Sequence, residues 1–194
     1  GGKVLTLSDS SGYIYDKGGI DEEKLSHIME LKNKRRARVN VYLKKYPKAE
    51  FFQNRKPWEI PCDIALPCAT QNELAEKDAD LLIKNNCRCV GEGANMPSSP
   101  KAINRFAMHK ILYAPGKASN AGGVAVSGLE MAQNSLRYNW TRQEVDDKLK
   151  SIMGDIHQSC LYYGKEKNYV NYVKGANIAG FVKVADAMLA QGVV

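Results

Sequence analysis

Short apolar runs along the chain indicate four β-strands, at residues 3–8, 62–67, 88–90 and 111–114. At least one helix-like segment separates each run from the next. Parallel strands that helices cover on both faces show this kind of continuous apolar run, and their crossover connections are nearly always right-handed. The pattern therefore predicts an α/β fold, a doubly wound layer around a mostly parallel sheet.

Helix signals between and after these runs agree with that fold. Ser99 followed by Pro100 is a favourable N-cap and first-turn pair, and Thr141 with Glu144 has the spacing of a capping box. Apolar stripes follow at helical spacing after Thr141 and again over residues 178–189, and both are interpreted as packing faces. We expect residues 1–136 to form a dinucleotide-binding domain, and residues 137–194 to be helices that pack back on it and towards a further domain.

The start of the chain lacks one part of that architecture. A dinucleotide-binding unit of this kind opens with a strand, a glycine-rich turn and a helix that faces the pyrophosphate. No G-x-G-x-x-G pattern precedes residue 3. The chain is therefore expected to begin at the second strand of a Rossmann-like unit, with the first strand and the glycine-rich turn missing.

Composition narrows the class of protein. A chain of 194 residues with 44% hydrophobic and 25% charged residues is typical of a globular protein with a sizeable core. We expect no membrane association and a cytoplasmic location, with an organelle left open, because no apolar run approaches the roughly 20 residues of a membrane span. The five cysteines are odd in number and lack zinc-ligand spacing, which favours a reducing compartment and predicts no metal site.

The net charge of +7 is concentrated in one segment. Eight basic residues and no acidic one lie between positions 32 and 48: Lys32, Lys34, Arg35, Arg36, Arg38, Lys44, Lys45 and Lys48. Within a predicted helix, an apolar stripe through residues 25–29 continues at the same spacing into Lys32, Arg35 and Arg36. A phosphate site and a solvated basic surface are about equally favoured by this pattern alone. Nucleic-acid binding is a more remote alternative, and we expect none.

Asp9 and Ser10 directly follow the strand predicted at residues 3–8, close to where such a fold places the adenosine ribose. Hydroxyl and basic groups there suit the 2′-phosphate of NADP, whereas an acid suits the free 2′-hydroxyl of NAD. Asp9 therefore opposes a phosphate, and it is instead expected to contact a ribose hydroxyl.

Three later loops, each after a predicted strand, carry amide or hydroxyl residues, and the second and third also carry glycines. They cover residues 68–73, 91–97 and 117–124. Ligands of open α/β sheets bind outside the carboxyl ends of the strands, where we expect the loops to meet and Asn95 to bond a carboxamide. Singly, each loop is more often a simple turn than a site. Ser127 has no suitably spaced histidine and is not in a G-x-S-x-G elbow, so hydrolase chemistry is not expected.

Four strings closely resemble the hexameric glutamate dehydrogenases: PCATQNE at 67–73, GEGANMP at 91–97, NAGGVAVSGLE at 120–130 and GANIAGF at 175–181. The resemblance runs through essentially the whole chain. It implies the reversible oxidative deamination of L-glutamate to 2-oxoglutarate and ammonia, with NADP as coenzyme in preference to NAD. It also implies a homo-oligomer, in this family a hexamer.

The resemblance assigns roles to particular residues. Asn95 and Asn120 would orient the nicotinamide, Ala69 and Thr70 would line the dinucleotide groove, and Val124 and Ser127 would contact glutamate. Ser10, Lys32 and Arg35, with Arg36, would hold the 2′-phosphate, next to Asp9. The resemblance places the catalytic proton-transfer residues in an amino-terminal domain that the chain lacks, so the 194 residues alone are expected to show no turnover. A leucine, phenylalanine or valine dehydrogenase and a non-catalytic nucleotide-binding module are the alternatives.

Overall fold

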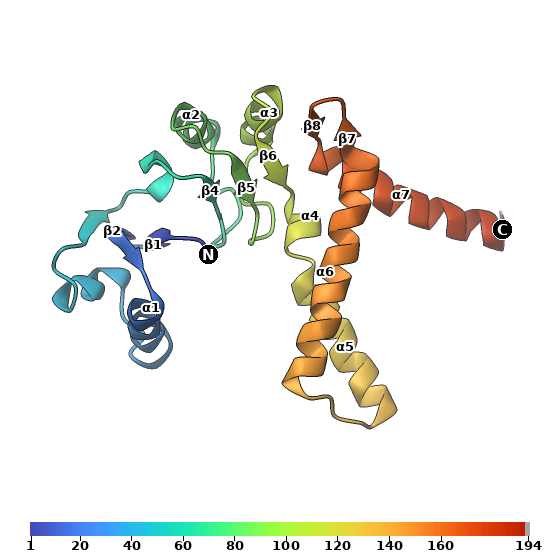
Figure 1. Ribbon diagram of the computed structural model, residues 1–194, viewed down its shortest axis with the longest axis horizontal. Coiled ribbons are helices and arrows are strands. Elements are labelled where there is room, and N and C mark those ends of the chain that lie inside the picture. Colours follow the sequence, from blue (N-terminus) through green and yellow to red (C-terminus); the bar gives the residue numbers. More distant parts are fainter. Residues whose placement is uncertain (193–194) are drawn as a thin grey trace. The chain divides into compact units, whose positions relative to one another are not determined.

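A computed structural model describes residues 1–192, which form two compact units: Gly1–Ile60, called unit 1, and the chain from Pro61 onward, called unit 2. Figure 1 shows their secondary structure in chain order. The division at residues 60 and 61 follows contacts within the chain. The domain boundary predicted at residue 136 is a different division, and it stays a prediction.

Unit 1 is built on an antiparallel sheet of three strands in the order β1-β2-β3. These are β1 (Val4–Asp9), β2 (Gly12–Ile20) and β3 (Glu50–Gln53). The first predicted strand is therefore present, but it pairs with β2 in a hairpin and not in a parallel sheet, because the chain reverses directly after Asp9 and pairs it with Gly12. Gly12 has a φ of 139°, and a Cβ there would lie 2.2 Å from the carbonyl oxygen of Phe52. A side chain at this position would force β2 and β3 apart.

The helical part of unit 1 is broken, in contrast to the continuous basic helix that the sequence pattern predicts. It consists of α1 (Glu22–Met29), a π-helical turn (Glu30–Lys34) and 3-10 turns at Val39–Lys44 and Pro57–Glu59. Arg36 adopts a φ of 52°, in the left-handed region, which ends any right-handed helix. The core beneath these turns consists of Ile14, Ile28, Leu31, Val39, Tyr42 and Ala49.

Unit 2 contains the predicted parallel sheet, with three strands in the order β4-β5-β6. They are β4 (Ile64–Ala65), β5 (Cys89–Gly91) and β6 (Leu112–Ala114), joined through α2 (Glu76–Lys84) and α3 (Pro100–Met108). The hydroxyl of Ser99 accepts from the backbone amide of Ala102, so the predicted N-cap of α3 is confirmed. The strands and helices bury Leu74, Leu82, Val90, Phe106 and Tyr113. Three of the four predicted strands thus form the predicted sheet.

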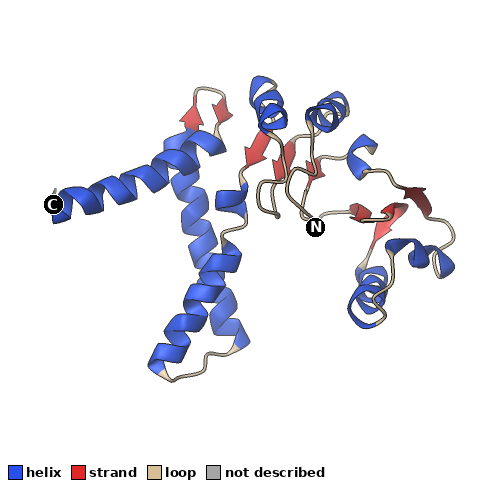
Figure 2. Cartoon of the chain, turned by 180° about the vertical axis from the view of Figure 1, so that it is seen from behind, coloured by secondary structure: helices blue, strands red, loops and turns tan. Residues whose placement is uncertain are grey.

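Helices make up the rest of unit 2, and Figure 2 shows them in blue. After the short α4 (Gly116–Ser119) come α5 (Gly122–Leu136), α6 (Arg142–Gly164), a hairpin of β7 (Lys165–Glu166) and β8 (Tyr169–Val170), and α7 (Tyr172–Gln191). The capping box at Thr141 and Glu144 is confirmed, since each side chain bonds the other residue's backbone amide. Helix α6 packs against both α5 and α7.

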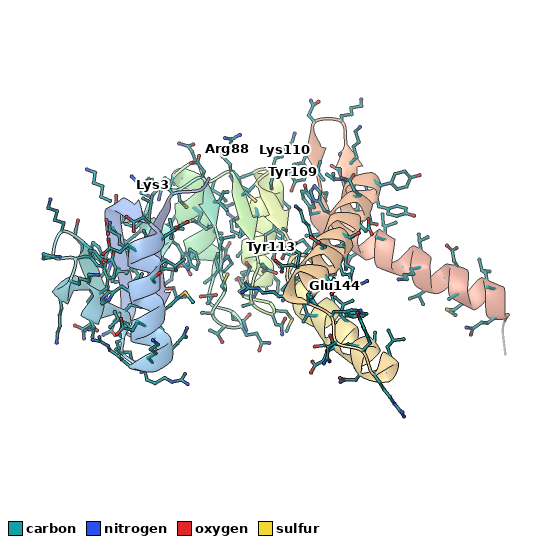
Figure 3. The ribbon with its side chains drawn as sticks, turned by 60° about the horizontal axis from the view of Figure 1, so that its bottom comes forward. Lys3, Arg88, Lys110, Tyr113, Glu144 and Tyr169 are labelled. Carbon is teal, nitrogen blue, oxygen red and sulfur yellow. The ribbon has the colours of Figure 1, made fainter. Side chains whose placement is uncertain are left out.

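Close contacts fix the start of α7. A Cβ on Gly175 would lie 2.1 Å from the carbonyl oxygen of Cys160 in α6, so α6 and α7 approach as closely as they do only with glycine there. A Cβ on Gly180, five residues later in the same helix, would have no atom within 4 Å. The hydroxyl of Tyr169 donates to the carbonyl of Ile111 over 3.1 Å, which joins the β7–β8 hairpin to the start of β6 (Figure 3).

Two helices of unit 2 carry large apolar side chains that the described chain leaves uncovered. Phe181 is 72% exposed and Leu189 is 82% exposed on α7, and Val124 and Met131 are exposed on α5. Over residues 1–192, no helix is both long enough and apolar enough to cross a membrane.

Candidate functional site

The loops that follow β4 and β5 lie side by side at the carboxyl end of the parallel sheet. The backbone amides of Asn72 and Leu74 donate to the carbonyls of Met96 and Pro97, over 3.0 and 2.8 Å. The amide of Gly93 donates in the other direction, to the carbonyl of Pro67, over 3.0 Å. Two of the three predicted loops are therefore parts of one backbone network.

Glu92 joins the third loop to this network. Its carboxylate accepts from the amide of Ser98 (3.1 Å) and from the amide of Gly116 after β6 (2.7 Å), and it is only 4% exposed. Burial and a hydrogen bond to this carboxylate raise the pKa of Tyr113, which stays a neutral donor. Sequence reasoning singled out the loop but not Glu92. The available signal was an acidic residue between two glycines directly after an apolar strand.

Asn95 and Asn120 meet across two loops. The side-chain nitrogen of Asn120 donates to the Oδ1 atom of Asn95 over 2.7 Å and to the carbonyl of Ala94 over 3.1 Å. Within residues 1–192, the side-chain nitrogen of Asn95 and the side-chain oxygen of Asn120 have no hydrogen-bond partner. An amide donor and an amide acceptor thus remain available, the pair of groups that a carboxamide ligand needs.

Ala69 and Thr70 lie at the tip of the first loop, and both are exposed. Their backbone amides donate to one carboxylate oxygen of Glu73, over 2.8 and 3.4 Å. The loop therefore has a fixed shape in which its backbone donors are already satisfied, while the two side chains face outward.

Val124 and Ser127 lie in the first turns of α5, directly after the loop that carries Asn120. They are three residues apart, so they share one face of the helix, and both are exposed. Lys117, in the short helix α4 just before the third motif, donates from its ammonium group to the side-chain oxygen of Asn177 in α7. This contact connects α4 to the fourth sequence motif.

In unit 1, the carboxylate of Asp9 accepts four hydrogen bonds from other residues of the unit. One oxygen accepts from the amide and hydroxyl of Ser11 (2.9 and 2.6 Å), and the other accepts from the ammonium group of Lys32 (2.9 Å) and the amide of Val39 (3.0 Å). Burial acts to raise the pKa of Asp9, but these hydrogen bonds outweigh it and hold the pKa well below its ordinary value. Four bonds occupy the roughly four acceptor positions of a carboxylate.

Ser10 and Arg38 lie next to this closed network, and both are exposed. A guanidinium nitrogen of Arg38 donates to the hydroxyl of Ser10. Sequence reasoning counted Arg38 in the basic segment but did not select it as a site residue. Its position at the end of the run of residues 34–38 gave no indication that the chain folds back towards β1 there.

The other predicted basic residues have different surroundings. The ammonium group of Lys32 donates to Asp9 and to the carbonyl of Ala37 (3.1 Å), so Asp9 neutralises its charge within the unit. Arg35 forms an ion pair of 2.6 Å with Glu30, in which both side chains are exposed. Arg36 is exposed and has the left-handed backbone described above. These three side chains therefore do not form the single cationic helix face that the spacing predicts.

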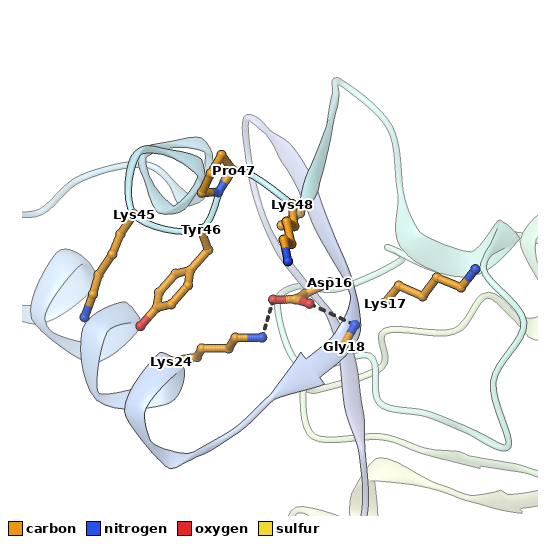
Figure 4. Close-up of a pocket in the computed structure, with 9 residues that line it drawn as sticks. Asp16, Lys17, Gly18, Lys24, Lys45, Tyr46, Pro47 and Lys48 are labelled. Carbon is orange, nitrogen blue, oxygen red and sulfur yellow. Dashed lines mark hydrogen bonds and ion pairs between the residues drawn. The ribbon is translucent and has the colours of Figure 1, made fainter.

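A pocket in unit 1 lies at the end of β2, and none of the predicted coenzyme- or substrate-binding residues lines it (Figure 4). Asp16 forms its buried base and accepts from the ammonium group of Lys24 over 2.8 Å and from the hydroxyl of Tyr42 over 2.8 Å. Burial acts to raise the pKa of Asp16, and the hydrogen bonds from Lys24 and Tyr42 lower it overall.

No group of three or more metal-binding side chains occurs among residues 1–192.

Comparison with known proteins identifies the family of this chain. The profile of the Glutamate/Leucine/Phenylalanine/Valine dehydrogenases matches residues 1–192, nearly the whole chain. The chain belongs to this family. Membership accounts for the order of the four sequence motifs, three of which lie at the loops and strand ends described above.

Individual dehydrogenases are similar to the chain along its whole length. A glutamate dehydrogenase of Bacteroides thetaiotaomicron is 62% identical over 195 residues, covering 100% of the chain and 44% of the relative. An NAD(P)-specific glutamate dehydrogenase of Xylanibacter ruminicola is 59% identical, with 100% of the chain and 44% of the relative covered. The crystal structure of Plasmodium falciparum glutamate dehydrogenase aligns with a TM-score of 0.93 at 50% identity, over 99% of the chain and 42% of that protein.

The chain spans less than half of the length of these dehydrogenases. Their names differ in the coenzyme, since NAD(P)-specific, NAD-specific and NADP-specific glutamate dehydrogenases are all among the relatives. Family membership therefore supports a nicotinamide coenzyme, and the names of the relatives do not decide between NAD and NADP.

Proposed function

We propose that the protein carrying this chain is an NADP-linked glutamate dehydrogenase, which converts L-glutamate and water to 2-oxoglutarate and ammonia and runs in both directions. The observation that carries the proposal is the meeting of three loops at the carboxyl end of the parallel sheet, with Asn95 and Asn120 in contact, in a chain of this dehydrogenase family. Nicotinamide supplies the hydride acceptor when it is bound.

The nicotinamide carboxamide fits Asn95 and Asn120. The contact between the two side chains leaves one amide donor and one amide acceptor unused, and a carboxamide carries the complementary acceptor and donor. Glu92 holds the third loop against the second, so the two asparagines would not have to be brought together when the coenzyme binds. Ala69 and Thr70, exposed at the tip of the first loop, are assigned to the wall of the dinucleotide groove.

The 2′-phosphate of NADP fits Ser10 and Arg38 in unit 1. A hydroxyl and a guanidinium group already lie in contact at an exposed strand end, and guanidinium binds phosphate oxygens through charge-assisted hydrogen bonds. Asp9 does not oppose this assignment, because Lys32 neutralises its carboxylate. Lys32 acts by holding Asp9, whereas Arg35 and Arg36 would add positive charge around the site.

Glutamate would contact Val124 and Ser127, which share an exposed face of α5 next to the Asn120 loop. The serine hydroxyl is suited to a carboxylate oxygen, and the valine is suited to the aliphatic stem of the substrate. We assign the proton-transfer steps to residues outside this chain. The exposed apolar residues of α5 and α7 favour a homo-oligomer, for which the family resemblance suggests a hexamer.

The test is a coenzyme and substrate matrix with the protein at its natural full length. Reduction of NADP and of NAD would be followed with L-glutamate, L-leucine, L-phenylalanine and L-valine as matched substrates. Turnover with glutamate and NADP, well above the rate with any other pair, is the expected result. Turnover with an apolar amino acid in place of glutamate would assign the chain to another branch of the family. Binding of NADP without any turnover would leave only a nucleotide-binding module.

A further inference from the structure

Cys62 and Cys87 lie opposite each other at the amino ends of two neighbouring strands. Strand β4 pairs with β5 in parallel, with Ile64 opposite Cys89, and the same register two residues earlier places Cys62 opposite Cys87. The pairing continues beyond the strands, because the amides of Arg88 and Cys89 both donate to the carbonyl of Asp63, over 2.9 and 3.1 Å. Residues in register on neighbouring strands project to the same face.

This register has a spacing that a disulfide tolerates. Neighbouring strands lie about 4.8 Å apart, and the Cα atoms of disulfide-bonded cysteines lie about 4.4–6.8 Å apart. The two side chains also interact, since a hydrogen bond between them shifts the pKa of both thiols. The Cys87 thiol is also within hydrogen-bonding distance of the carbonyl oxygens of Asp63 and Cys89, at 3.6 and 3.3 Å. Arg88 follows Cys87 in the sequence and is exposed (Figure 3).

The two thiols differ in character. The hydrogen bond with Cys87 lowers the pKa of Cys62 against the effect of burial, whereas the same bond, together with burial, raises the pKa of Cys87. Cys62 is half-buried and Cys87 is only 2% exposed. Cys62 is thus the accessible sulfur with more thiolate character, and Cys87 is a protected sulfur beside it.

We propose that Cys62 and Cys87 form a reactive dithiol pair, which a small disulfide oxidant such as glutathione disulfide converts into an intrachain disulfide. The thiolate of Cys62 attacks one sulfur of the oxidant, forms a mixed disulfide and releases one glutathione thiolate. Cys87 then loses its proton, attacks the Cys62 sulfur and displaces the second glutathione thiolate. The two cysteine thiols lose two electrons, the oxidant is reduced to two thiols, and the two cysteine protons end on them.

The other cysteines are less suited to this reaction. Burial raises the pKa of Cys89 and that of Cys160, which favours the unreactive thiol form. Cys68 is exposed, but it lies in the loop after β4 and not at the paired strand starts. The disulfide would join the starts of β4 and β5, the two strands that lead into the first two loops of the candidate site.

The experiment treats the full-length protein with glutathione disulfide, blocks the remaining thiols by alkylation and maps the linked peptides by mass spectrometry. Cys68→Ser is present throughout, because an exposed thiol would compete for the oxidant. We expect a Cys62–Cys87 link to form before any other link within this chain, and dithiothreitol to reverse it. Cys89→Ser is the matched control and should retain the link.

Single substitutions separate the two roles. Cys87→Ser should accumulate one glutathione on Cys62, whereas Cys62→Ser should acquire no glutathione on Cys87. Cys87→Ala repeats the first test with a smaller apolar side chain in case serine prevents folding. Formation of a different intrachain disulfide first, or alkylation of Cys62 and Cys87 at full yield after treatment with the oxidant, would overturn the proposal.

Discussion

Asn120 donates a hydrogen bond from its side-chain nitrogen to the side-chain oxygen of Asn95 over 2.7 Å, across two loops that follow different strands of the parallel sheet. The bond fixes which polar atoms of the two amides remain for a ligand. It also makes the second and third loops depend on each other.

Replacement of Asn120 by alanine should weaken coenzyme binding. The change removes the bonds to Asn95 and Ala94 and one acceptor for a carboxamide, each worth about 1 kcal/mol. We expect the KM for NADP to rise by about 10-fold or more. Steady-state kinetics with saturating glutamate measure this effect. Asn134→Ala, at an exposed position on α5, is the control, and an unchanged KM in Asn120→Ala would remove the proposed role.

Arg38 should determine the preference for NADP over NAD. A charge-assisted hydrogen bond is worth roughly 1.5–3 kcal/mol, so Arg38→Ala should raise the KM for NADP by about 10- to 100-fold and leave the KM for NAD nearly unchanged. The matched control is Lys34→Ala, which removes one exposed positive charge from the same segment. Equal losses with NADP and NAD, or equal effects of the two variants, would contradict direct phosphate binding by Arg38.

Asp9 should stabilise unit 1 in a pH-dependent way. Its pKa is lower in the folded protein than in the unfolded chain, so the carboxylate stabilises the fold above the unfolded pKa of about 3.9 and loses this effect as the pH falls towards the folded pKa. Asp9→Asn should lower the free energy of unfolding at neutral pH by about 1.5–3 kcal/mol. Urea denaturation at neutral pH and at about pH 3 measures the difference.

The sign of this pH dependence is the critical result. The gap between wild type and Asp9→Asn should narrow in acid, because the unfolded chain binds a proton at Asp9 below about pH 3.9, whereas the folded protein, in which Lys32 pairs with the carboxylate, binds it only at lower pH. Asp186→Asn, at an exposed position on α7, serves as the control and should behave like wild type at both pH values. A gap that is constant or widens in acid would mean that the charge of Asp9 is not what stabilises the unit.

Gly175 and Gly180 form a matched pair within one helix. Gly175→Ala would place a Cβ 2.1 Å from the carbonyl oxygen of Cys160, and the backbone there can only move as a whole, so we expect a loss of about 3 kcal/mol or more. Gly180→Ala meets no atom within 4 Å and should stabilise α7 by up to about 1 kcal/mol through helix propensity. Thermal unfolding of both variants measures the contrast, and equal changes in Tm would show that α6 and α7 are not packed through Gly175.

Much of unit 2 could be predicted from sequence because its signals are local. The apolar runs at residues 62–67, 88–90 and 111–114 correspond to β4, β5 and β6, and the caps at Ser99 and Thr141 begin helices where predicted. The meeting of three loops followed from one general property of parallel sheets, whose strand ends share an edge. Glu92 was not found, since its function depends on amides that lie 6 and 24 residues away.

Unit 1 was harder because its structure depends on contacts between distant polar residues. Strand β2 contains Asp16, Lys17, Gly18 and Gly19, which hide the alternation of a strand, so the β1–β2 hairpin was missed. The basic segment has helical spacing, but Arg36 takes a left-handed conformation and Arg38 returns to Ser10. Helical periodicity cannot show that Lys32 will bond Asp9, 23 positions earlier.

The enclosed carboxylate of Asp9 also bears on how coenzyme preference changes among related enzymes. The carboxylate of Asp9 accepts all four of its hydrogen bonds from unit 1 itself. Such a residue can be retained with either coenzyme, because it stabilises the fold. On the proposed assignment, selection on coenzyme choice would act on the exposed neighbours Ser10 and Arg38. Relatives named for different coenzymes can on this basis share one scaffold and differ at a few surface side chains.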